Sequence, residues 1–146
     1  MTNSIPWTSL ESLLKKILEI ANNRSEVDIA IGAYVWCEYV LTELLTLLRE
    51  SGFSGRIILG GPQISYTPSG LEELYPEADI FVRGYGEMAL VAIFNERKLK
   101  QIQGVHFAGD EDLNEQTIVD LSMLPSPWLT EAIDLDNQRF IRWESQ

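Results

Sequence analysis

The stretch Arg56-Ile57-Ile58-Leu59-Gly60-Gly61-Pro62 decides the fold that this sequence predicts. Its apolar residues are typical of a short buried strand over 56–59, and the Gly-Gly-Pro that follows predicts a sharp turn. The same arrangement stands on either side, where an apolar strand over 27–31 is followed by Gly32, and one over 79–82 by Arg83-Gly84-Tyr85-Gly86. Three such strands predict a parallel sheet whose turns open onto one edge, where α/β proteins bind ligands.

Amphipathic segments alternate with these strands. The sequence Thr8-Ser9-Leu10-Glu11 fits a capping box and predicts a helix over 8–22. A second helix is expected over 36–50, ended by Ser51-Gly52. Its predicted buried face consists of Trp36, Val40, Leu41, Leu44, Leu45, Leu47 and Leu48.

Two further helices complete the alternation. A loop through Tyr66 leads to a short helix near 69–75, with Pro68 suited to its first position. The last helix, over 87–94, carries Met88, Val91 and Phe94 on one side. The pattern predicts an α/β fold, a Rossmann-like and flavodoxin-like parallel sheet with right-handed crossovers and helices on both faces.

The pattern changes near Gly104. Segments 104–108 and 117–119 flank Gly109-Asp110-Glu111-Asp112 and predict an antiparallel hairpin. Residues 124–129 read Leu-Pro-Ser-Pro-Trp-Leu, an extended linker, because each proline keeps its predecessor out of the helical region. We therefore divide the chain into a Rossmann-like domain, residues 1–103, and a hairpin and linker, residues 104–146.

The composition argues against several classes of function. The formal net charge of −11 argues against nucleic acid, whose phosphates require clustered Lys and Arg. No apolar run is long enough to span a bilayer, so no membrane partner is expected. Cys37 is the single cysteine, which excludes an internal disulfide, a structural zinc site and an iron–sulfur cluster held by this chain, and it favours a cytoplasmic location.

Several residues carry two interpretations each. The run Gly84-Tyr85-Gly86-Glu87-Met88-Ala89 satisfies a dinucleotide fingerprint, but it follows the third strand, and Glu87 stands where a pyrophosphate should bind. His106 is either a base or metal ligand or, as we favour, an ordinary half-exposed strand residue.

The remaining candidates also have two interpretations. Cys37 is either activated at a helix start or a buried structural thiol. Asp134 and Asp136 are interpreted as surface groups rather than paired catalytic carboxylates. Trp36 either lines a wall against a planar ligand or fills the core.

At these residues the chain resembles a known family. The run from Gly32 through Tyr34-Val35-Trp36 and Gly60-Gly61-Pro62 to Arg83-Gly84-Tyr85-Gly86-Glu87 looks like the cobalamin-binding domain at the N-terminus of B12-dependent radical SAM enzymes. Residues 106–129 are similar to that family's hairpin and connector, and residues 140–145 resemble the strand that leads into its radical SAM core. The resemblance implies that this chain binds a corrinoid, as the cobalamin module of an enzyme that is methyltransferase-type.

The resemblance also implies the contacts. The loop at Tyr34, Val35 and Trp36 would face the corrin ring, and the two later glycine turns would lie along the nucleotide tail. The implied cofactor-binding residues are Gly32, Tyr34, Val35, Trp36, Gly60, Gly61, Pro62, Ser65, Gly84, Tyr85, Gly86 and Glu87. Replacing Gly61 with a bulky residue is then expected to abolish corrinoid retention without unfolding the domain.

Three departures from the family pattern shape the expectation. The Asp-x-His-x-x-Gly signature is absent, so the corrinoid is expected to bind without a histidine axial ligand. The family has further strands before the helix at 8–22, which predicts a sheet truncated at its N-terminal side. The Cys-x-x-x-Cys-x-x-Cys motif is absent, so the [4Fe–4S] cluster and S-adenosylmethionine would belong to a radical SAM core in cis or in trans, and the chain alone has no catalytic residues.

An alternative interpretation assigns the same fold but no cofactor. In it, the chain is a degenerate B12-like domain that binds no corrinoid and acts as a scaffold or interaction domain. An unpaired strand at the sheet edge would then favour a homodimer or docking to another domain.

Overall fold

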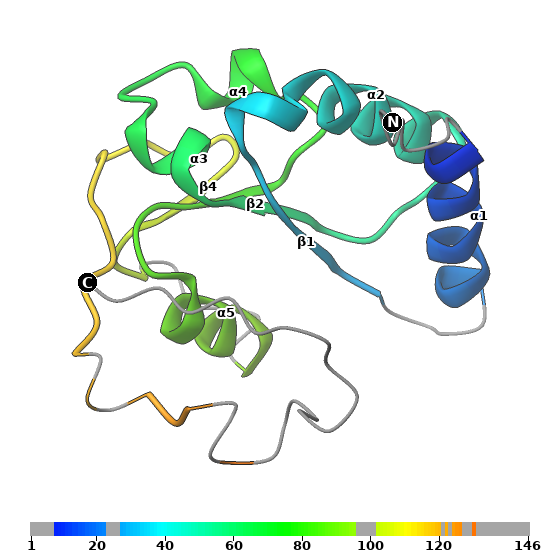
Figure 1. The fold of residues 1–146 in the computed structure, drawn as a ribbon. Coiled ribbons are helices and arrows are strands. Elements are labelled where there is room, and N and C mark those ends of the chain that lie inside the picture. The colour runs from blue at the N-terminus through cyan, green and yellow to red at the C-terminus, as the bar shows by residue number, and fades with distance from the viewer. Residues whose placement is uncertain are drawn as a thin grey trace, which may run out of the picture.

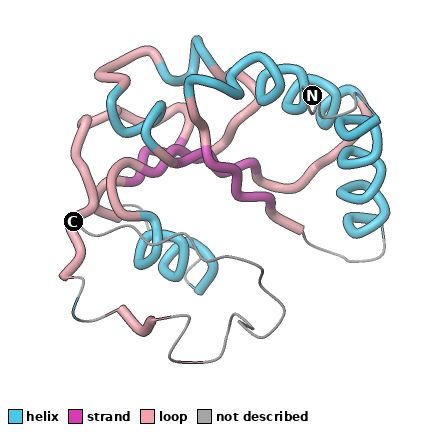
Figure 2. The backbone as a smooth tube through the Cα atoms, viewed as in Figure 1, coloured by secondary structure: helices cyan, strands magenta, loops and turns pink. Residues whose placement is uncertain are grey.

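The structure is a computed structural model that describes residues 8–22, 27–95, 102–120, 122, 124–126 and 130. Four strands form its centre, and helices pack around them (Figures 1 and 2). In chain order the elements are α1 (Thr8–Asn22), β1 (Ile29–Gly32), the 3-10 helix η1 (Val35–Cys37), α2 (Glu38–Glu50), β2 (Ile57–Gly60), α3 (Pro62–Tyr66), α4 (Leu71–Leu74), β3 (Ile80–Val82), α5 (Gly86–Asn95) and β4 (Val105–Phe107).

The strands form one open sheet in the order β1-β2-β3-β4. β1, β2 and β3 run parallel, and β4 pairs antiparallel with β3 at the far edge. This is the α/β, Rossmann-like architecture that the alternation of strands and helices predicts. The three parallel strands end at the same side of the sheet, so the turns that follow them share one edge.

Both faces of the sheet are covered, because side chains alternate along each strand. Ile57, Leu59 and Phe81 point to the face that α1, α2, α3 and α4 cover. Ile58, Ile80 and Val82 point to the opposite face, where Ala89 and Ile93 of α5 pack against them. In Figure 1, α5 accordingly lies on one side of the strands and the other helices lie on the other side.

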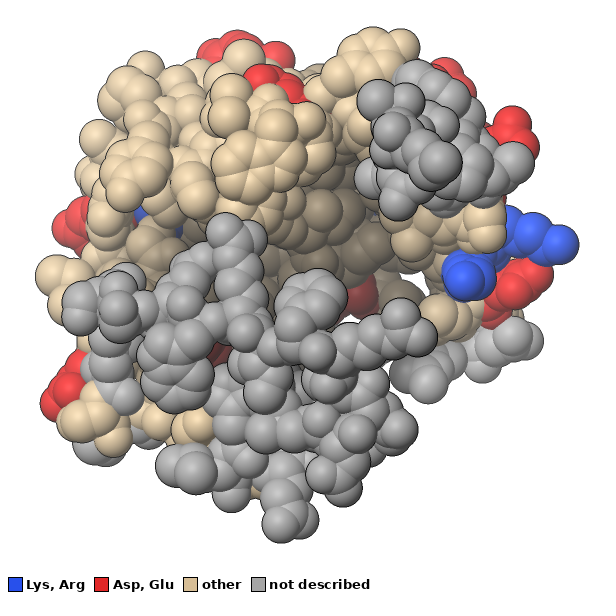
Figure 3. Space-filling model, in the orientation of Figure 1, with Lys and Arg blue, Asp and Glu red and all other residues tan. Residues whose placement is uncertain are grey.

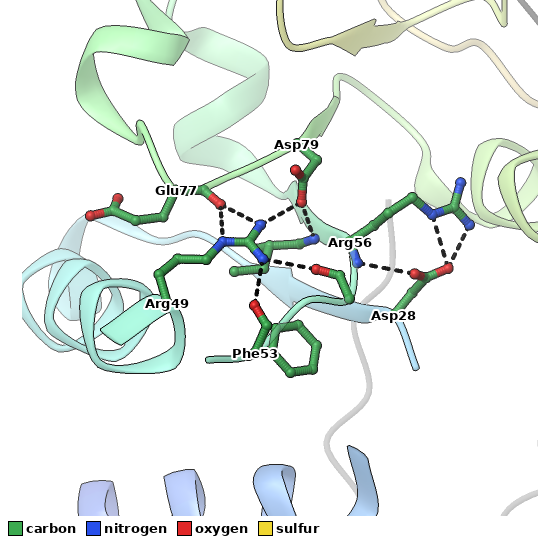
Figure 4. A network of polar contacts seen from close by, with 8 residues as sticks. Asp28, Arg49, Phe53, Arg56, Glu77 and Asp79 are labelled. Atoms are coloured by element: carbon green, nitrogen blue, oxygen red, sulfur yellow. Dashed lines mark hydrogen bonds and ion pairs between the residues drawn. The ribbon is translucent and has the colours of Figure 1, made fainter. Parts of the chain in front are cut away.

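A polar network fixes the edge opposite the glycine turns (Figure 4). The Arg49 guanidinium, from the last turn of α2, donates to the carbonyls of Phe53, Gly55 and Glu77 and pairs with Asp79 at 2.6 Å. Asp79 also accepts the Ile57 N–H at 2.6 Å, and Arg56 pairs with Asp28. These bonds hold the beginnings of β1, β2 and β3 in register.

The predicted hairpin is wrong. Residues 105–107 pair with β3, while Thr117 forms an isolated parallel bridge with Gly84. A two-stranded hairpin alone is marginal in water, whereas the edge of an existing sheet offers a prepared partner. β4 thus lies in the same sheet as β1, β2 and β3, although the sequence places it in the second segment.

Helix details also differ from the predictions. Residues 62–66, expected to be a loop, form α3, because Pro62 suits the first turn of a helix. α4 begins at Leu71 after Gly70 rather than at Pro68. On α5, the side that carries Met88, Val91 and Phe94 is half exposed, and Ala89 and Ile93 contact the sheet. Val40 and Trp36 are likewise exposed, so neither belongs to the buried face of α2.

Candidate functional site at the carboxyl edge of the sheet

The three glycine turns lie side by side at the carboxyl ends of the strands. The Ala33 N–H donates to the Gly60 carbonyl at 2.7 Å, and the Gln63 N–H donates to the Ala33 carbonyl at 3.2 Å. The Gly84 N–H donates to the Ser65 hydroxyl oxygen at 2.9 Å. Hydrogen bonds therefore join the first turn to the second and the second to the third.

Two of the glycines are required by the chain itself. Gly61 has a φ of 93°, and a Cβ there would lie 3.0 Å from the Ala33 carbonyl oxygen. Gly84 has a φ of 79°, and a Cβ there would lie 2.5 Å from the Thr117 carbonyl oxygen. Backbone fills the space on the side of both residues where a side chain would project, so a ligand tail could not lie in that space.

The turn after β1 presents aromatic rings to solvent instead. Tyr34 and Trp36 stack with their ring centroids 4.8 Å apart and their planes at 25°. Trp36 is 79% exposed, so it does not fill the core. The Tyr34 ring lies over Gly32, where a Cβ would come within 3.1 Å of it. The absence of a side chain at Gly32 thus allows the ring pair to lie against the edge of the sheet.

Further exposed apolar side chains follow the same strand ends. We call this set the aromatic edge: Tyr34, Val35, Trp36, Tyr39, Tyr66, Tyr85 and Met88. They come from η1 and the start of α2, the end of α3 and the start of α5, which all border the carboxyl ends of β1, β2 and β3. The space-filling view shows mostly uncharged surface over α3 and the start of α2, with carboxylates near α4 (Figure 3).

The other residues that the sequence predicts to contact the cofactor lie in the helices and turns beside the aromatic edge. Pro62 begins α3, and the hydroxyl of Ser65 is occupied by the Gly84 N–H. Gly86 begins α5, and Glu87 is an exposed residue of its first turn. Sequence reasoning missed Tyr39 and Tyr66. Tyr66 follows the Gly-Gly-Pro turn closely, and its position after a strand end was the available signal.

Beneath this edge, Tyr75 is buried, and its hydroxyl donates to Glu38 Oε1 at 3.5 Å. Burial, together with the negative charge of Glu38, raises the pKa of Tyr75. The phenol therefore stays protonated and serves as a hydrogen-bond donor under the start of α2.

The other candidate residues are separate from the aromatic edge. His106 is buried rather than half exposed; its ring stacks on Phe81, and its Nε2 lies 2.9 Å from Glu72 Oε1. The Cys37 thiol is half buried and donates to the Tyr34 carbonyl at 3.4 Å. Asp134 and Asp136, like the segment 140–145, lie outside the described residues. No group of three or more metal-ligating side chains occurs in the part of the chain that the structure describes.

A cavity of about 660 Å³ lies elsewhere, between β4 and the segment 110–115. At its wall the buried Arg83 guanidinium donates to the carbonyls of Ile64 and Thr67 and pairs with Asp112 at 2.5 Å. Burial opposes the charge of Asp112, but hydrogen bonds from Arg83 and from the Asn114 N–H outweigh it and lower the pKa of that carboxyl. Arg83 thus attaches the 110–115 segment to the sheet and to the end of α3.

Comparisons with known proteins add no family. A scan of the sequence against protein-family models finds no match, and a search of the curated proteins finds none. Among the described residues, no helix has the length and apolar character needed to cross a membrane.

Proposed function

We propose that this chain binds cobalamin at the aromatic edge, as the corrinoid-binding module of a B12-dependent radical SAM enzyme. The observation that carries the proposal is the stacked pair of Tyr34 and Trp36, exposed at the carboxyl end of β1. An exposed, stacked pair of aromatic rings at this edge suits a planar macrocycle. The sequence resemblance over residues 32–87 supports the choice of a corrinoid among planar ligands.

The aromatic edge suits the corrin ring of cobalamin, whereas the glycine turns do not suit a nucleotide tail threaded between them. The faces of Tyr34 and Trp36 offer stacking area, while backbone fills the space beside Gly61 and Gly84. In our proposal the ligand therefore lies over the aromatic edge, with its tail on the outer surface near Gly32 and Tyr85. This arrangement changes the tail position that the resemblance implies and retains the position of the ring.

The proposed binding uses no histidine ligand. His106 is the only histidine in the chain, and its ring is buried with Nε2 on Glu72. When bound, cobalamin supplies methyl-transfer chemistry, and the residues of this chain bind and orient it. With Cys37 as the single cysteine, the chain cannot hold a [4Fe–4S] cluster, so the proposal assigns the cluster and S-adenosylmethionine to a separate radical SAM core in a cytoplasmic enzyme, methyltransferase-type by resemblance.

Co-elution of the protein with hydroxocobalamin on a gel-filtration column tests the proposal. We expect the wild-type chain to carry about one equivalent of corrinoid and to shift its visible spectrum. Trp36→Ala should weaken retention about tenfold, because stacking on an aromatic face contributes on the order of 1–3 kcal/mol. Phe94→Ala is the matched control, since Phe94 is a half-exposed aromatic at the other end of α5. Equal loss in both variants, or no retention by the wild-type chain, would contradict the proposal.

The rival function, a scaffold without cofactor, is favoured by one observation. Within the described residues, β1 pairs only with β2, so its other side is an unpaired strand edge. A homodimer through this edge would appear as a concentration-dependent rise in sedimentation coefficient. Ala30→Pro should suppress it, because proline removes the outward-facing N–H of that residue. A dimer together with no corrinoid retention would select the scaffold.

A further inference from the structure

β4 forms the other edge of the sheet, and two of its outward-facing backbone groups have no partner among the described residues. The Arg83 N–H donates to the Gly104 carbonyl and the Ala108 N–H to the Asp79 carbonyl. Because bonded pairs alternate along an antiparallel ladder, the backbone of His106 faces β3, and that of Val105 and Phe107 faces away.

Two of the four outward-facing groups are used by local turns. The Val105 N–H donates to the Ile102 carbonyl, and the Phe107 carbonyl accepts from the Asp110 N–H. The Val105 carbonyl and the Phe107 N–H have no partner among the described residues. In a parallel pairing, a single residue of an extended chain donates to one such carbonyl and accepts from one such N–H.

An open groove lies beside this edge. It is the cavity of about 660 Å³ described above, and it runs between β4 and the segment 110–115. This is the place where the predicted hairpin would have put its second strand. Since Thr117 pairs with Gly84 instead, segment 110–115 passes the edge of β4 without pairing with it. The groove has apolar walls from Ile102, Phe107 and Leu113.

The rim of the groove is acidic. Asp110, Glu111 and Glu115 line it, are exposed, and have no ion-pair partner among the described residues. Asp112 is already neutralised by Arg83. Among the residues that the structure describes, the charge left at the rim is therefore negative, and it complements a positively charged occupant.

We propose that this groove binds an extended basic peptide segment, which adds a parallel strand to β4. Main-chain hydrogen bonds to the Val105 carbonyl and the Phe107 N–H hold the segment, and lysine or arginine side chains meet Asp110, Glu111 and Glu115. The site is separate from the aromatic edge and does not depend on corrinoid binding.

The probe is the peptide acetyl-Lys-Val-Lys-Val-Lys-amide, titrated into the full chain. Two control peptides are compared with it: one with glutamate in place of lysine, and one with every backbone nitrogen methylated. We expect the basic peptide to bind and to slow hydrogen exchange at the Phe107 amide. The acidic peptide should not bind, and the methylated peptide should bind about tenfold more weakly, because it keeps its charge and loses its donors.

Variants of the protein locate the binding. Glu111→Lys with Glu115→Lys should weaken binding of the basic peptide at least about tenfold, whereas Glu43→Lys, an exposed charge reversal on α2, should leave it unchanged. Equal affinity for the methylated peptide, binding without protection of Phe107, or no binding at about 100 µM would each overturn the proposal. Self-association that protects Phe107 without added peptide would overturn it too.

Discussion

Gly61 is a position where contacts within the protein require glycine. The sequence marks it as a position where only glycine fits, and the structure agrees, with a φ of 93° and a ψ of −177°. The neighbour that a side chain at this position would meet is the carbonyl of Ala33. A bulky residue at this position would strain the fold itself, so we expect it to lower stability whether or not a ligand is bound.

Gly61→Ala should therefore lower the free energy of unfolding by about 3 kcal/mol, since strained backbone and close contact add. Gly52→Ala is the matched control: Gly52 also has a positive φ, 82°, but a Cβ there would meet nothing within 4 Å. It should cost only about 1 kcal/mol. Urea unfolding of both variants measures the difference, and equal losses would refute the close contact with Ala33.

Arg83 is the second residue whose removal should be costly. Its side chain is 1% exposed and bonds Ile64, Thr67 and Asp112. Arg83→Met should destabilise the protein by about 3–5 kcal/mol, because it leaves buried acceptors without a donor. Urea unfolding provides the measurement, and a loss near zero would show that the guanidinium does not attach segment 110–115 to the sheet.

The same pair predicts a pH dependence. Because the pKa of Asp112 lies below the ordinary aspartate value of 3.8, the stability that its charge contributes is present above that value and is lost as the pH falls through the folded-state pKa. Asp112→Asn removes this contribution at every pH. The difference in unfolding free energy between wild type and variant should therefore shrink between about pH 5 and about pH 2. A constant difference over that range would contradict the Arg83–Asp112 pairing.

At the scale of elements, α5 shows that apolar composition alone does not determine which side of a helix is buried. Every residue from Met88 to Phe94 is apolar, so the sequence could not show which side meets the sheet. Ile93→Ala should cost about 2–5 kcal/mol, because Ile93 packs against Ile58, Ile80 and Val82. Val91→Ala, on the exposed side, should cost less than about 1 kcal/mol. Thermal unfolding of the two variants compares them, and the reverse ranking would show that α5 packs by its other side.

The strands were predictable and the connections were less so. Each parallel strand ends within one residue of its predicted end, because an apolar run followed by glycine identifies a buried strand well. α3 was missed because a five-residue helix has no periodicity to detect. The hairpin was wrong because sequence spacing cannot show that residues 105–107 find a better partner in β3 than in their neighbours along the chain.

For the whole molecule, the parallel topology gathers residues that sequence order keeps apart. Knowing that three strands run parallel was enough to place Gly32, Gly60 and Gly84 on one edge. It was not enough to show that the chain fills the space beside Gly61 and Gly84, or that Trp36 points outward. The filled space beside the two glycines depends on the approach of Ala33 and Thr117, which no local pattern encodes.

The most direct measurement of the central claim uses Trp36 as its own reporter. In a variant with Trp7, Trp128 and Trp143 changed to phenylalanine, Trp36 is the sole tryptophan, and hydroxocobalamin is titrated while its fluorescence is followed. Corrinoid binding at the aromatic edge predicts quenching that saturates near one equivalent. Quenching that only rises in proportion to added corrinoid, as it does for free N-acetyltryptophanamide, would contradict it.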